Sequence, residues 1–401
     1  MSSLLGSTKR NTGDAGYIWL SFVSFVVLFI ENIFDEKLPV SVRYFDEVLA
    51  IFCLLGILLY LVGKHGKMPR NVGQIAIIMI ALALEGLVGN MFSNLQPWRV
   101  VFLDAFLFFK PYFVLIFFLL TMTTDRAKAI LKHAVKFSKL GLLFLASCGF
   151  LSLVADLGMM KNGAFSMYSL FYGSVSVWAI LFYAVIFCNK EKKTFIYFCL
   201  MAFVVILTKS GLGIAMIGII ALIHLFFFRY KFHWYYVPIV GAIALFIGAP
   251  VLEEYFFTSN TPRYLLFYFS FVTMGACAPF GSGFATYGSA MAAREYSPLY
   301  YQYGFEDRYM MSPEDTRALQ DSFYPIVFAQ FGIFGTILYI IFIYLLLRKF
   351  IFRMTNKYSI NSALIVISLM LIACIGFQTL NLWGCAMFFL IAVFFKSSEE
   401  I

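Results

Sequence analysis

An arginine at the start of a short apolar stretch is the first candidate for chemistry in this chain. Arg263 follows Pro262 and precedes the stretch 264–278, YLLFYFSFVTMGACA. A guanidinium stays charged at any relevant pH and donates paired hydrogen bonds to phosphoryl oxygens. Arginine at such a position also suits a simple anchor at a membrane interface. Arg263 is therefore a candidate phosphate clamp, with interfacial anchoring as the alternative that position alone favours.

A carboxylate marks the other end of the same polar region. Asp321 stands just before the apolar segment 323–347. It could accept a proton as a general base, or it could cap the N-terminus of the following helix. Spacing alone favours the cap, and the base is the alternative.

Glycines, tyrosines and further arginines fill the region between these two residues. The run PFGSGFATYG at 279–288 has glycines that allow a backbone to approach a ligand or a helix closely, and packing is the simpler explanation. Phenol rings suit either sugar faces or the membrane interface. The candidates for substrate contacts are Arg294, Arg308, Arg317, Tyr287 and Tyr301.

Three ionisable residues fall well inside apolar segments: Glu85, Asp104 and Lys110. At about 1.5 Å per helical residue, they would lie about 10, 8 and 16 Å below the outer surface, so they could meet. An unpaired charge in a membrane is costly and is a functional hypothesis by default. The pattern leaves open an ion-paired structural cluster and a role in moving substrate or protons.

The elements that position these residues must be membrane helices. The chain has 401 residues, of which 62% are hydrophobic and 13% charged, with a mean hydropathy of +0.87. Such usage excludes a soluble protein, and continuous apolar runs exclude the alternating pattern of a β-barrel. About 20 apolar residues span a bilayer as a helix. Twelve segments qualify, near 17–34, 46–63, 73–93, 100–122, 140–157, 167–188, 194–208, 211–228, 234–250, 323–347, 361–376 and 378–395.

The placement of charge predicts the orientation of this all-α membrane domain, which covers 1–401. With both termini in the cytoplasm, the cytoplasmic segments hold 20 of the 30 Lys and Arg residues and five of the 21 acids. This is the positive-inside pattern, so the net charge of +9 reflects orientation rather than a nucleic-acid partner. A full span at 264–278 would invert every later loop. We therefore predict a re-entrant or interfacial helix there, within a large external loop at 251–322.

Common catalytic and metal signatures are missing from the sequence. It has no Walker loop, no HExxH, no Asp-x-Asp and no CxxC among its seven cysteines. We expect no disulfide framework, no metal and no organic cofactor. Chemistry would have to rest on arginines, carboxylates and tyrosines.

Several of these features together resemble the O-antigen polymerase and ligase superfamily (Wzy and WaaL type). Arg263 is followed after fifteen residues by PFGSG, and Asp321 stands eleven positions before Gly332 in DSFYPIVFAQFGIFG. The late family motif commonly has His-Asn, a Glu two residues before the Gly and a second Gly three further on. The corresponding residues here are Asp321, Ser322, Gln330, Gly332 and Gly335.

A second motif, LTKSG at 207–211, resembles the family's Leu-Thr-x-Ser-Arg. Thr208 and Ser210 match, Gly211 replaces the usual arginine, and Lys209 could supply the cation instead. The family also has about twelve spans, cytoplasmic termini and a large late external loop.

The resemblance implies a metal-independent, inverting membrane glycosyltransferase that depends on lipid-phosphate sugars. Its substrates would be polyprenyl-diphosphate-linked oligosaccharide repeats, joined into O-antigen, capsule or exopolysaccharide at the outer face of the cytoplasmic membrane. Arg263, with Lys209 and the other candidate cations, would bind the diphosphate, and Asp321 would be the base. A flippase and a chain-length regulator are the expected partners beside the lipid bilayer.

Two rival functions stay open. One is an O-antigen ligase that transfers finished glycan to another acceptor. The other is a secondary transporter or lipid-linked oligosaccharide flippase, with its centre at Glu85, Asp104 and Lys110.

Overall fold

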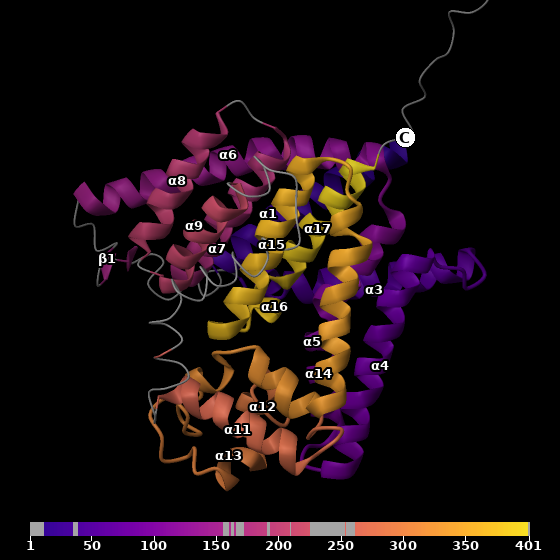
Figure 1. Cartoon of the computed structure of the whole chain (residues 1–401), viewed down its shortest axis with the longest axis vertical. Coiled ribbons are helices and arrows are strands. Elements are labelled where there is room, and N and C mark those ends of the chain that lie inside the picture. The colour runs from indigo at the N-terminus through magenta and orange to yellow at the C-terminus, as the bar shows by residue number, and fades with distance from the viewer. Residues whose placement is uncertain are drawn as a thin grey trace, which may run out of the picture.

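The protein is a helical bundle in the computed structural model, which describes residues 12–34, 39–154, 160–161, 164–165, 172–190, 193–208, 210–224, 253 and 261–399 (Figure 1). The first half comprises α1 (Thr12–Phe34), α2 (Val40–Arg43), α3 (Phe45–Gly63), α4 (Arg70–Ser93), α5 (Trp98–Thr121), α6 (Thr124–Val154), α7 (Tyr172–Cys188), α8 (Thr194–Leu207) and α9 (Gly211–Ile223). The second half comprises α11 (Pro262–Ala276), α12 (Ala290–Arg294), α13 (Pro298–Gln302), η4 (Arg317–Gln320), α14 (Tyr324–Lys349), η5 (Ile351–Arg353), α15 (Lys357–Gly376), α16 (Thr379–Leu382) and α17 (Gly384–Ser398). One small antiparallel hairpin joins β1 (Met160–Lys161) to β2 (Ala164–Phe165).

Seven of the described helices are long and apolar enough to cross a bilayer. They are α1, α3, α4, α5, α6, α14 and α15. Four further apolar helices, α7, α8, α9 and α17, have fewer than 18 residues. The chain is therefore a polytopic α-helical membrane protein.

The helices agree with the sequence prediction in kind, while the count of twelve spans stays a prediction. Eleven of the twelve expected segments overlap described helices, with 378–395 divided between α16 and α17, and the remaining one, 234–250, lies outside the described residues. The segment 124–139, expected as a cytoplasmic loop, instead forms the first half of α6. It contains no glycine or proline, and Lys128, Lys132 and Lys136 recur every four residues on one helical face.

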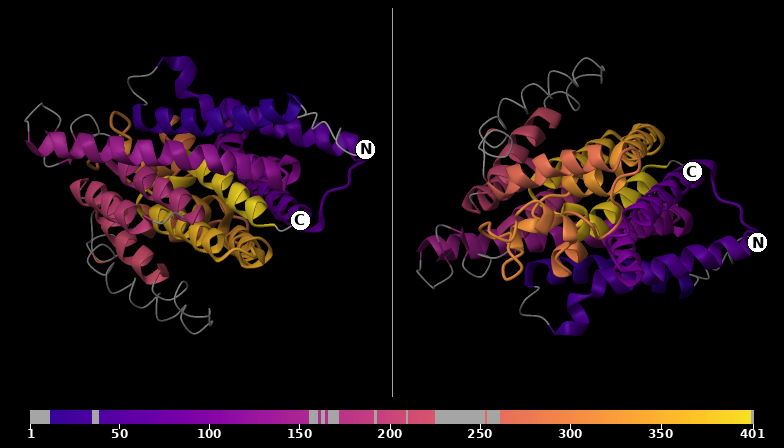
Figure 2. Two further views of the ribbon diagram at one scale, coloured as in Figure 1. Left: turned by 90° about the horizontal axis from the view of Figure 1, so that it is seen from above. Right: turned by 90° about the horizontal axis from the view of Figure 1, so that it is seen from below.

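The bundle is organised around α7. Every residue from Ser174 to Cys188 is buried, which is typical of a helix that other helices surround on all sides. Aromatic rings fill the contacts: the ring of Trp178 lies 5.6 Å from that of Phe25 on α1, and Phe182 lies 5.7 Å from Phe137 on α6. Seen from above, α1 and α6 run side by side (Figure 2).

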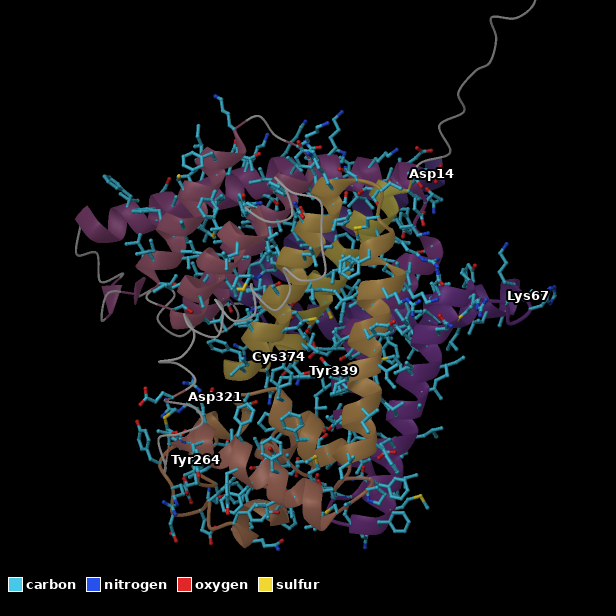
Figure 3. The ribbon with its side chains drawn as sticks, in the orientation of Figure 1. Asp14, Lys67, Tyr264, Asp321, Tyr339 and Cys374 are labelled. Atoms are coloured by element: carbon cyan, nitrogen blue, oxygen red, sulfur yellow. The ribbon has the colours of Figure 1, made fainter. Side chains whose placement is uncertain are left out.

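Residues 261–322 form a folded module rather than an open loop. Its short helices enclose a hydrophobic cluster of their own, which includes Leu266, Tyr287, Tyr300 and Phe305. The module lies at the end of the molecule opposite Asp14 and the C-terminal end of α17 (Figures 1 and 3). The helix α11 has 15 residues, too few to cross a bilayer, and packs against α14. Its bounds lie close to the expected segment 264–278, and its re-entrant or interfacial placement stays a prediction.

The segment 279–288, here called the glycine loop, is threaded into the bundle, and side chains from neighbouring helices bind its backbone. Asn90 of α4 donates to the carbonyl of Phe284 at 2.9 Å and accepts from its N–H at 2.7 Å. Asp104 of α5 accepts from the N–H of Ala285 at 2.6 Å. Buried peptide groups need such partners because no water reaches them.

A break in α14 supplies further partners of the glycine loop. Gly332 has φ 59° and ψ −154°, which interrupts the helix. The carbonyl groups of Ala329 and Gln330 accept from the N–H groups of Ser282 and Gly283, both at 2.9 Å. The kink in α14 and the glycine loop therefore stabilise each other through these hydrogen bonds.

Gly283→Ala should destabilise the protein strongly. Gly283 has φ +88°, and a Cβ there would lie 2.4 Å from the backbone nitrogen of Asn90. Left-handed backbone strain and overpacking together should cost about 2 to 4 kcal/mol. The measurement is the thermal unfolding midpoint of the purified protein in detergent. Gly275→Ala on α11 is the control, since a Cβ there would meet nothing within 4 Å; equal midpoints for the two variants would contradict the packing described.

Candidate functional site

Arg263 is placed by the start of α11. Thr261 is the N-cap residue, and its hydroxyl accepts from the N–H of Tyr264 at 3.3 Å. Pro262 occupies the first turn, where its missing N–H has no cost. Arg263 therefore sits in the first turn of a helix whose N-terminal end is electropositive.

Asp321 is placed by contacts with the end of α15. It directly follows η4, and the next residues are fixed: the Ser322 hydroxyl donates to the carbonyl of Ile375 at 2.8 Å, and the N–H of Phe323 donates to that of Cys374 at 3.0 Å. The N-cap residue of α14 is Phe323, with no side-chain capping bond. Asp321 is thus not the helix cap that spacing favoured.

Arg263 and Asp321 form an ion pair. Their Nη2 and Oδ2 atoms are 3.2 Å apart, although the residues are 58 positions apart in the sequence. Both side chains are partly open to solvent, with 27% and 34% of their surface exposed. Burial raises the pKa of the Asp321 carboxyl, and the positive charge of Arg263 partly opposes that rise. Asp321 and the neighbouring Tyr264 lie at the same end of the molecule (Figure 3).

The other candidate cations lie elsewhere on the module. Arg317 donates to both oxygens of Asp315 at 2.8 Å and is 71% exposed. Arg294 lies 3.9 Å from Glu295 and is 73% exposed. Arg308 is also exposed. These arginines are available at the surface, but the site is built on Arg263.

The two candidate tyrosines have different environments. Tyr287 is completely buried, and its hydroxyl donates to the carbonyl of Leu266 at 2.9 Å. Its ring packs in the module core, so the structure does not support a sugar contact by Tyr287. Tyr301 is 54% exposed, with its ring 4.8 Å from that of Tyr296, and it keeps a face for a ligand.

The LTKSG motif has a local structural task at its described residues. The Ser210 hydroxyl caps α9 by accepting from the N–H of Gly213 at 3.3 Å. The Thr208 hydroxyl donates to the carbonyl of Val205 at 2.7 Å. Both side chains are buried, and Lys209 lies outside the described residues. A role in substrate binding for Thr208, Lys209 and Ser210 stays a prediction.

The three intramembrane charges do not form one group. Asp104 binds the glycine loop. Glu85 is buried on α4 where it packs against Gly335 of α14, and its Oε1 has no hydrogen-bond partner within the described part of the chain. Lys110 has two acidic neighbours that the sequence did not connect with it. Glu85, Asp104 and Lys110, which the spacing allowed to meet, therefore have separate surroundings among the described residues.

Lys110 instead joins α5 to α3. Its ammonium contacts Asp46 and lies 3.1 Å from an oxygen of Glu47, while Glu31 of α1 accepts from the N–H of Asp46 at 3.4 Å. The structure buries Asp46 and Glu31, because α3 begins at Phe45 and its first turn faces α5. One oxygen from each of the three carboxylates lies within 4.8 Å of the others, a spacing that a metal ion could bridge. Lys110 already supplies positive charge there.

Lys110→Met should lower stability by about 3 to 5 kcal/mol, because it leaves buried carboxylates without their cation. The thermal midpoint of the purified protein measures this, with Lys396→Met as control for the half-exposed pair of Lys396 and Glu399. The double variant Lys110→Met with Asp46→Asn should recover part of the loss. A midpoint like that of the control would show that the cluster does not hold α3 to α5.

The fold defines a class, a polytopic α-helical membrane protein with a compact module at one end. Comparison with known proteins adds nothing more specific: no family model, no curated protein and no solved structure matches the chain. The site itself must therefore carry any functional argument.

Proposed function

We propose that this protein is a membrane glycosyltransferase that polymerises oligosaccharide repeats carried on polyprenyl diphosphate. The observation that supports this function is the Arg263–Asp321 ion pair. Two separate motifs that resemble those of the O-antigen polymerase and ligase superfamily contribute one residue each, and the fold brings the side chains within 3.2 Å. We further propose that the site faces outward from the cytoplasmic membrane, since Asp14, close to the N-terminus that the charge pattern assigns to the cytoplasm, lies at the opposite end of the molecule from Tyr264 and Asp321 (Figure 3).

The proposed reaction divides between the two groups. Arg263 binds an oxygen of the donor diphosphate and stabilises the negative charge that develops as the bond from the anomeric carbon to the phosphate oxygen breaks. Asp321 takes the proton from the acceptor hydroxyl, whose oxygen forms the new bond to the anomeric carbon from the opposite face. The anomeric centre is inverted, and polyprenyl diphosphate leaves. A flippase that supplies the donor and a regulator of chain length complete the proposed system.

Arg263→Ala and Asp321→Asn should each abolish long polymer. Loss of one charge-stabilising donor typically costs about 10²–10³ in rate, and loss of a general base about 10²–10⁴. Polymer length in cells with matched protein levels is the measurement. Arg126→Ala and Asp14→Asn alter another partly exposed Arg–Asp pair, between α6 and α1 at the other end of the molecule, and are the controls. Normal polymer in both test variants would overturn the site.

The pH dependence of the rate should show a base whose pKa lies above the ordinary range of aspartate. Burial raises the pKa of Asp321, so the unprotonated base appears only as pH rises through that higher value. Initial rates in membranes should therefore rise as the pH passes through the pKa of Asp321. In an Asp321→Glu variant that retains activity, this rise in rate should occur at a different pH. A rate independent of pH from 4 upward would contradict Asp321 as the base.

Two alternatives have direct tests. A ligase would release labelled glycan from polyprenyl diphosphate onto a different acceptor, whereas a polymerase leaves the product on that lipid. A transporter or flippase is favoured by the buried charges around Lys110. Activity lost in a folded Lys110→Arg variant, with Arg263 and Asp321 variants silent, would favour the transporter.

A further inference from the structure

The Asp321 carboxylate occupies the place on Arg263 that an anionic ligand would take. Its Oδ2 lies 3.2 Å from Nη2, close to the distance at which a guanidinium holds a phosphoryl oxygen. A carboxylate in this pair is also a poorer base, because the neighbouring cation favours its charged form. In the ion pair, therefore, Arg263 is not free to bind a phosphate and Asp321 is a weaker proton acceptor.

The construction of the site allows this pair to open without a change of fold. Arg263 belongs to the first turn of α11, and Asp321 belongs to the turn between η4 and α14. The backbone after Asp321 is fixed to α15 by Ser322 and Phe323. The two backbones can stay in place while the side chains separate, and both side chains are partly exposed. Rotamer changes of such side chains take picoseconds to nanoseconds.

A diphosphate is the stronger competitor for the arginine. It presents more negative charge and more acceptor oxygens than one carboxylate, and the N-terminal end of α11 adds favourable potential for an anion. Once Asp321 has lost its cation, the partly buried carboxylate binds a proton more readily.

We propose that the donor diphosphate and Asp321 compete for Arg263, so that donor binding releases Asp321 to act as the base. This inference rests on the proposed function and adds an order to it: donor first, then activation of the acceptor hydroxyl. Without donor the base stays paired.

The competition makes a prediction that differs from that of an ordinary active-site residue. Removing the Asp321 carboxylate should abolish polymerisation and tighten diphosphate binding. The probe is a short prenyl diphosphate, titrated calorimetrically into the purified full-length protein in nanodiscs. The dissociation constant should fall about three- to tenfold in Asp321→Asn and in Asp321→Ala, as expected for loss of a partly exposed ion pair. It should rise at least tenfold in Arg263→Ala.

Asp14→Asn is the matched control, since it removes the carboxylate of the Arg126 pair at the other end of the molecule and should leave the dissociation constant unchanged. Unchanged or weaker binding in both Asp321 variants would overturn the competition. Equal binding by the wild type and Arg263→Ala would overturn it too, because the anion would then bind elsewhere. If the Asp321 variants bind the diphosphate more tightly but the wild-type protein itself forms no polymer, the competition is sustained and the proposed function is rejected.

Discussion

The requirement that buried peptide groups find hydrogen-bond partners underlies the structure of the end of this protein that holds the 261–322 module. The glycine loop brings a stretch of irregular backbone into an apolar bundle, where an unpaired N–H or C=O costs several kcal/mol. Asn90, Asp104 and Gln330 supply the partners from three different helices. The position of the whole 261–322 module follows from these contacts, because α11 ends just before the loop and the first turn of α14 begins just after the module.

The proposed site depends on this arrangement from both sides. Arg263 lies near the start of the module and Asp321 near its end, so the packing of the glycine loop between them determines whether the two side chains meet. Asp104 is then easier to understand: its carboxylate accepts a hydrogen bond from the backbone N–H of Ala285, which gives its burial a structural reason. Lys110 likewise acts within the bundle, where it holds the first turn of α3 against α5.

Much of this could be predicted from local sequence. The helical class, most helix positions and the short helix after Pro262 follow from apolar run length and cap residues such as Thr261. The importance of Arg263 and Asp321 came from motif order. Their contact could not be predicted, because it depends on a fold that closes over 58 residues. The partners of Lys110 were missed for a related reason: Asp46 and Glu47 lie at a helix start, where acids are ordinary, and only packing shows that this turn is inside. Tyr287 resembles Tyr301 in sequence, and only the packing of the module core distinguishes the buried ring from the exposed one.

Recognition of the glycine loop through its peptide groups also affects how such a protein can evolve. The polar residues that hold the loop are single positions, Asn90, Ser93, Asp104, Gln330 and Gln378, spread over most of the chain. The apolar residues between them need only be of a suitable size, because lipid and packed helices accept many combinations. Two proteins of this architecture therefore need to share only a few identical residues, and these are widely spaced in the sequence. Divergence can then proceed far in the sequence while the arrangement of helices and loop is kept.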